Sequence, residues 1–100
     1  MTGMPGQLEW AAQIKPRVGA EFDRVAAAFE ATAARQAEPD RGETLAVIAI
    51  LAEKRAEVMA IQQAGYFIRD WQELTDQVRQ MIGQDPRFKT IQTSRAARRR

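Results

Sequence analysis

LAVIAILA, at positions 45–52, is the longest apolar run of the chain, and it lies in a segment of good helix formers from Thr44 to Ala64. A helix that is apolar on nearly every side has to be covered by neighbouring elements. The run therefore predicts a central helix over residues 44–64, with other helices packed around it and Leu51 buried between them.

The segment before this central helix carries the pattern of a second helix, interrupted by one proline. Apolar or small residues recur every three or four positions from Leu8 to Ala33. Pro16 lies inside this pattern, and proline has no backbone N–H and disfavours helical geometry at the residue before it. We therefore expect a break or a kink near Lys15, with a short helical arm before it and a longer helix from Pro16 to about residue 36.

The segment after the central helix predicts a third helix. Gly65 favours the end of the central helix, because helices often close with a glycine in the left-handed conformation. Between Phe67 and Ile82 the apolar residues fall on one side of a helical projection and most charged residues on the other. The sequence thus predicts an all-α fold: a small helical bundle of three principal helices plus a short N-terminal helical arm, with one domain over residues 1–86 and a basic C-terminal tail over residues 87–100.

Composition narrows the classes of function. The chain has no cysteine and no histidine, so it lacks thiolate nucleophiles, zinc–thiolate ligands and the commonest general base. We expect a non-enzymatic protein with no cofactor and no metal. No signal-peptide pattern opens the sequence, and the eight-residue apolar run is far shorter than the ~20 residues that cross a bilayer, so a cytoplasmic location is expected. Eighteen alanines, and twelve arginines against three lysines, favour a GC-rich bacterial genome or a phage of such a host.

Four residues are candidates for binding a protein partner. A helical projection places Arg55 and Gln62 among apolar positions, where a charge needs a partner. The Arg55 side chain either packs by its stem and pairs with a carboxylate such as Glu21 or Asp76, or lines a groove that receives an acidic group. The aromatic side chains of Tyr66 and Trp71 are expected in the core, and the alternative is that they are exposed and anchor a protein partner. The candidate partner-binding residues are Arg55, Gln62, Tyr66 and Trp71.

The C-terminal tail differs in charge from the rest of the chain. Residues 1–86 carry a net charge of −4, whereas residues 87–100 carry +6 with no acidic side chain. One interpretation is that the tail binds an anionic partner: a polyanion such as nucleic acid, an acidic protein or a membrane surface. The alternatives are that the tail stays solvated, or that Phe88 and Ile91 hold it to the core while its arginines pair with the acidic body. If Ser94 caps a helical turn, the arginines gather on one face. The candidate polyanion-binding residues are Arg95, Arg98, Arg99 and Arg100.

These observations lead to two functional hypotheses. The first is a protein–protein interaction or assembly module, with a homodimer as the simplest way to cover the central helix. The alternative is a nucleic-acid-associated protein, regulatory or phage-encoded, that uses its C-terminal arginines.

Overall fold

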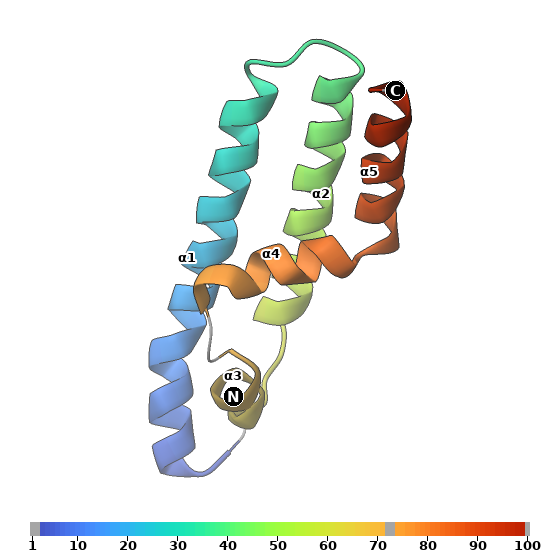
Figure 1. Cartoon of the computed structure of the whole chain (residues 1–100). Helices are drawn as coiled ribbons and strands as arrows, with labels where there is room; N and C mark the ends of the chain where they lie inside the picture. The colour runs from blue at the N-terminus through green and yellow to red at the C-terminus, as the bar shows by residue number, and fades with distance from the viewer. Residues whose placement is uncertain (1–2, 72–73, 100) are drawn as a thin grey trace.

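The computed structural model describes residues 3–71 and 74–99, and over these residues it contains five helices and no strand. The helices are α1 (Pro5–Ala33), α2 (Asp40–Met59), α3 (Ala64–Asp70), α4 (Leu74–Gln84) and α5 (Pro86–Arg98) (Figure 1). The predicted all-α fold is confirmed, whereas the helices differ in number and bounds from the predicted bundle.

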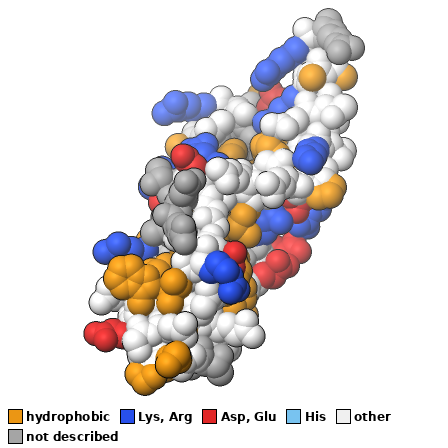
Figure 2. All heavy atoms as spheres, turned by 60° about the horizontal axis from the view of Figure 1, so that its bottom comes forward, with side chains coloured by type: hydrophobic (Ala, Val, Ile, Leu, Met, Phe, Trp, Pro, Cys, Tyr) orange, Lys and Arg blue, Asp and Glu red, His pale blue; other side chains and the backbone are white. Residues whose placement is uncertain are grey.

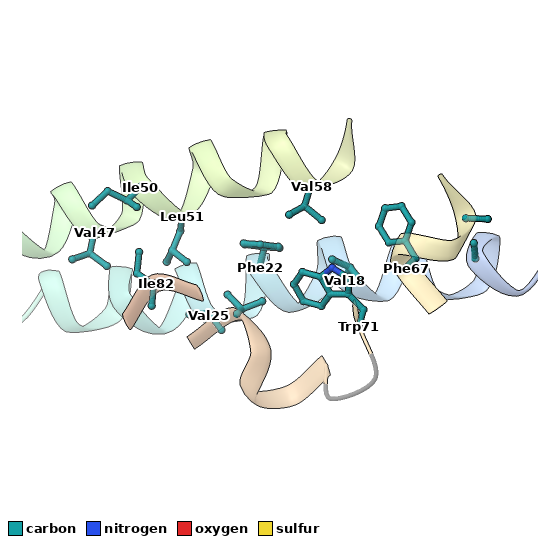
Figure 3. Close-up of a cluster of buried hydrophobic side chains, with 13 residues drawn as sticks. Val18, Phe22, Val25, Val47, Ile50, Leu51, Val58, Phe67, Trp71 and Ile82 are labelled. Atoms are coloured by element: carbon teal, nitrogen blue, oxygen red, sulfur yellow. The ribbon is translucent and has the colours of Figure 1, made fainter. Parts of the chain in front are cut away.

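The core lies mainly between α1 and α2, which run side by side in opposite directions (Figures 1 and 3). Residues at helical spacing on the two helices face each other and are at most 3% exposed, and Leu51 is buried as expected. These residues are Val18, Phe22, Val25, Val47, Leu51 and Val58.

The smaller helices cover one side and one end of this pair. Helix α4 crosses in front of α1 and α2 (Figure 1), and its Val78 and Ile82 are buried in the same core. Helix α3 packs on the N-terminal half of α1, where Lys15 Nζ donates to the Ile61 carbonyl at 3.4 Å and lies 5.5 Å from the Phe67 ring centre. Lys15 thereby links α1 to the segment between α2 and α3 and to α3 itself.

Of the two outcomes expected near Pro16, a break or a kink, the break is absent, because α1 is one helix of 29 residues that passes through this proline. Proline in a helix interior costs ~3 kcal/mol. Residues on both sides are fully enclosed, since Ala11 and Val18 have no exposed surface. We attribute the continuity of α1 to this packing, so the short arm and the longer helix expected from the sequence are a single element.

The central helix is displaced towards the N-terminus, and the third helix is divided. Helix α2 begins at Asp40 and ends at Met59, and Gly65 is the second residue of α3, so its assignment as a helix stop is wrong. Trp71 follows α3 in a non-helical conformation (φ −118°, ψ 50°) and separates it from α4. The buried Ala64 and Phe67 hold α3 against α1, and we infer that this tertiary packing outweighs the local stop signal.

The basic segment at the C-terminus forms most of α5, which packs on α2 and α4. Asp85 caps this helix by accepting a hydrogen bond from the Arg87 backbone N–H at 2.8 Å, and Pro86 is its first residue. Ser94 lies in the helix interior and is not a cap.

Candidate functional site

The described residues contain no group of three or more histidine, cysteine, aspartate or glutamate side chains arranged to hold a metal ion. None of the described helices is both long and apolar enough to cross a membrane. The features that merit attention are therefore surfaces: an uncovered side of the α1–α2 pair, and the contact between α5 and α2.

The uncovered side of the α1–α2 pair lies opposite α4 and carries a shallow cleft of about 160 Å³. One wall comes from Phe22, Asp23, Ala26 and Glu30 of α1. The other wall comes from α2, with Ile48, Leu51, Ala52 and Arg55. At 100° per residue, the α1 residues at 23, 26 and 30 project away from Glu21 and Arg24, which electrostatically couple to Arg79 and Asp76 of α4.

Beside the cleft, α2 presents small apolar side chains to solvent. Leu45 is 48% exposed, and three alanines on the same arc of the helix are exposed as well. We call this surface of α2 together with the cleft the open face. The open-face residues of α2 are Leu45, Ile48, Ala49, Ala52, Arg55 and Ala56.

Arg55 lies in the open face and pairs with a carboxylate of α1, which is one of the two interpretations given from the sequence. The carboxylate is that of Asp23. The Arg55 Nε atom is enclosed, makes no hydrogen bond and lies 3.0 Å from Asp23 Oδ1, while Nη2 donates to Oδ2 at 3.4 Å. Gly19 makes room for this side chain, since a Cβ there would lie 3.1 Å from Arg55 Nη2. The two carboxylates named from the sequence are not the partner: Glu21 projects about 200° away from Asp23 around α1, and Asp76 lies on α4, on the opposite side of the helix pair.

The structure does not bring the four predicted partner-binding residues into one site. Trp71 is 2% exposed and packs with Phe22 at a ring-centre distance of 5.8 Å, so it is a core residue here (Figure 3). Tyr66 is half-buried and stacks edge-on against Phe67 at 5.2 Å. Gln62 is exposed in the segment between α2 and α3. Arg55 alone of the four lines the cleft.

The second surface is the contact between α5 and α2, which we call the α5 seam. Phe88, Ile91, Arg95 and Arg98 follow one another at spacings of three and four, so they share one side of α5. Phe88 and Ile91 are only partly buried, and no residue of α5 is fully buried. This side of α5 is therefore apolar in its first half, at Phe88 and Ile91, and basic in its second half, where Arg95 and Arg98 face the first turn of α2.

Arg95 and Arg98 both bind the acidic first turn of α2. Arg95 Nε lies 3.2 Å from Glu43 Oε1, and its Nη2 donates to Thr44 Oγ1 at 2.9 Å and to the Asp40 carbonyl at 3.1 Å. Arg98 binds Glu43 and donates to Asp40 Oδ1 at 2.8 Å. The Arg98 hydrogen bond, assisted by that of Arg95, holds the pKa of Glu43 below its ordinary value.

The start of α5 is fixed by ion pairs too. Lys54 Nζ lies 3.0 Å from Asp85 Oδ2, and Arg87 donates both to Asp85 and, at 2.7 Å, to Glu53. Hydrogen bonds from Arg87 and then Lys54 hold the pKa of Asp85 well below its usual range. Arg99 is exposed, and Arg100 lies outside the described residues. Of the predicted polyanion-binding residues, Arg95 and Arg98 are therefore already engaged within the chain.

Apolar side chains also gather at the N-terminal end of α1, which comes forward in Figure 2. Met4 is 70% exposed and Trp10 is 56% exposed. Single basic and acidic side chains lie among them in Figure 2.

Comparison with known proteins gives no relative to guide the assignment: no family model, no curated protein and no solved structure matches this chain.

Proposed function

We propose that this chain is a non-enzymatic assembly module that pairs with a second copy of itself through the open face. The observation that carries the proposal is surplus surface. The chain exposes 6472 Å², whereas a globular monomer of this mass exposes roughly 5,700 Å². The difference is close to the ~800 Å² that each partner buries in a standard interface.

The shape of the molecule supports the same proposal. The radius of gyration is 15.9 Å, against ~13 Å for a compact domain of this length. Helix α2 is ~30 Å long, and two adjacent helices are ~20 Å wide, so the open face offers ~600 Å² per copy. That area reaches the lower range of stable interfaces.

Residue sizes on α2 suit a two-fold arrangement. With antiparallel copies of α2 and the symmetry axis between Ala49 and Ala52, Leu45 of each copy lies against Ala56 of the other. A large side chain then meets a small one, and the alanines at the axis let the two helix backbones approach closely. Between Leu45 and Met59, all described, Arg55 is the only charged residue on this arc, and Asp23 pairs with it.

Sedimentation equilibrium of the full chain at micromolar concentration tests the proposal. We expect a species of twice 11.3 kDa. Ala49→Glu should convert it to monomer, because it places two carboxylates beside the axis. Ala31→Glu is the matched control, since Ala31 is exposed on the outward side of α1. A monomeric wild-type chain, or equal effects of the two variants, would refute the proposal.

Cysteine pairing tests the register, because the chain has no cysteine of its own. A mixture of Ala49→Cys and Ala52→Cys chains of different tagged mass should form a mixed disulfide preferentially under mild oxidation. Preferential formation of the two same-variant disulfides would exclude the axis position given above.

A further inference from the structure

The α5 seam differs from the rest of the interior in what holds it together. No α5 side chain is fully buried, and its large apolar contacts with the core are limited to the partly buried Phe88 and Ile91. Most of the remaining contacts are ion pairs between side chains that keep some exposure to solvent: the Arg98 side chain is 38% exposed and that of Asp40 is 52% exposed. Ion pairs of this kind are individually weak and are screened by salt. The seam is therefore the contact that a competing anion can most easily replace.

The charges of α5 are turned inward. Arg87, Arg95 and Arg98 all bind carboxylates. The carboxylates that Arg95 and Arg98 bind lie on the first turn of α2. A helical projection leaves Lys89 as the described cation on the outward side of α5, whereas Arg99, which caps the helix, projects on the same side as Arg95 and is exposed. Docked α5 therefore presents a much weaker positive surface than its sequence contains.

We propose that the first turn of α2, through Asp40 and Glu43, masks an anion-binding side of α5, and that the phosphate backbone of a nucleic acid competes with these carboxylates for Arg95 and Arg98. Guanidinium groups bind phosphate and carboxylate through the same forked donors, so one can replace the other. Glu43 binds both arginines at once, so its displacement removes a carboxylate contact from each of two cations. This inference is independent of the open face.

The composition of the inner side favours nucleic acid over a membrane surface. It carries two large apolar residues, Phe88 and Ile91, whereas helices that lie in a bilayer interface present a broad apolar face. Phe88 is two helical turns away from Arg95, which does not favour base stacking beside the arginines, so we expect contacts to the phosphate backbone without sequence preference.

Fluorescence anisotropy with a labelled DNA duplex of arbitrary sequence tests the masking. We expect the Asp40→Asn, Glu43→Gln double variant to bind roughly tenfold more tightly than wild type at ~50 mM salt, as the release of two arginines from their three surface ion pairs implies. The matched control is Glu9→Gln with Glu57→Gln, which removes two exposed carboxylates that lie outside the α5 seam. Equal tightening by the control would overturn the proposal, because it would reflect net charge alone.

A second set of variants identifies the arginines. Adding Arg95→Gln and Arg98→Gln to the unmasked chain should abolish the gain and reduce the salt slope of log K by about two. Persistence of the gain would place the binding elsewhere and overturn the proposal. Vesicles containing phosphatidylserine form the other arm: tighter binding to vesicles without tighter binding to the duplex would also overturn it. Helical circular dichroism shows whether each variant remains folded, and the single Glu43→Gln variant, expected to shift binding in the same direction, replaces a double variant that does not fold.

Discussion

The contact between α1 and α2 and the contact between α5 and α2 are built from opposite materials. The first contains fully buried valine, leucine and phenylalanine side chains, while the second joins partly exposed arginines to the carboxylates of one helical turn. Burial of apolar area is insensitive to salt and to mild acid, whereas ion pairs respond to both. The comparison implies that the contact of α2 with α1 persists as salt and pH change, whereas the contact of α2 with α5 depends on both.

The largest effect should come from the apolar contact. Leu51 is 1% exposed between the two helices, and Leu51→Ala should lower the free energy of unfolding by ~2–5 kcal/mol. Urea denaturation measures this loss, and the loss should be the same at low and at high salt. A loss below ~1 kcal/mol, outside the range for core leucines, would show that the α1–α2 contact is not the main source of stability.

Neutralising the α5 seam should have a smaller, salt-dependent effect. Arg95→Gln with Arg98→Gln removes the contacts to Asp40, Glu43 and Thr44, so the thermal midpoint should fall by less than in Leu51→Ala. The difference from wild type should shrink as salt screens the pairs. Lys89→Gln with Arg17→Gln is the control, since it removes the same charge from two exposed side chains outside the α5 seam. If both double variants melt alike, the seam contributes nothing specific.

Acid should loosen the α5 seam first. Because the pKa of Glu43 in the folded chain lies below its ordinary value of 4.5, the unfolded chain binds more protons as the pH falls past that value. The stabilisation that Glu43 provides is complete at neutral pH and is lost on acidification through its folded pKa. Thermal melts between about pH 7 and pH 3 should show a shallower loss for Glu43→Gln than for wild type. Parallel curves would contradict the role of Glu43.

The smallest effect concerns Gly19, where α1 approaches Arg55. Alanine gains up to ~1 kcal/mol over glycine in a helix interior. At Gly19 the new Cβ would lie 3.1 Å from Arg55 Nη2 and 3.3 Å from Met59 Cε, both at flexible ends. Gly19→Ala should therefore stabilise the chain by less than ~1 kcal/mol, as urea denaturation would measure. A gain of the full ~1 kcal/mol would mean that Arg55 moves aside without cost.

The sequence predicted the apolar contact better than the ionic one, for a physical reason. Apolar periodicity marks the buried stripes of α1 and α2 directly, because every third or fourth residue must avoid water. The α5 seam continues the spacing of Phe88 and Ile91 with Arg95 and Arg98, so its pattern looks like a polar tail when only hydrophobicity is counted. The sequence predicted only that the arginines of the tail could pair with the acidic body. It did not predict the individual partners, since these depend on how α5 lies along α2.

The errors at Pro16, Gly65 and Arg55 also have a common origin. Local signals predicted a break or a kink in α1 and a stop after Ala64, and the break and the stop are both absent where neighbouring residues are fully enclosed. The partner of Arg55 was missed because Glu21 and Asp23 differ by two positions yet point in nearly opposite directions around the helix. The open face was expected only as insufficient cover for the central helix, since sequence alone does not say which side of α2 stays uncovered.

The two tryptophans give this molecule an internal optical readout. Trp71 packs in the core, where its indole Nε1 has no hydrogen-bond partner among the described residues, while Trp10 is largely in water. An indole shielded from water emits at shorter wavelength than a hydrated one, so in a Trp10→Phe chain the colour of the emission reports the core alone. Loss of α5 from α2 would leave that colour unchanged, and opening of the α1–α2 contact would shift it to the red.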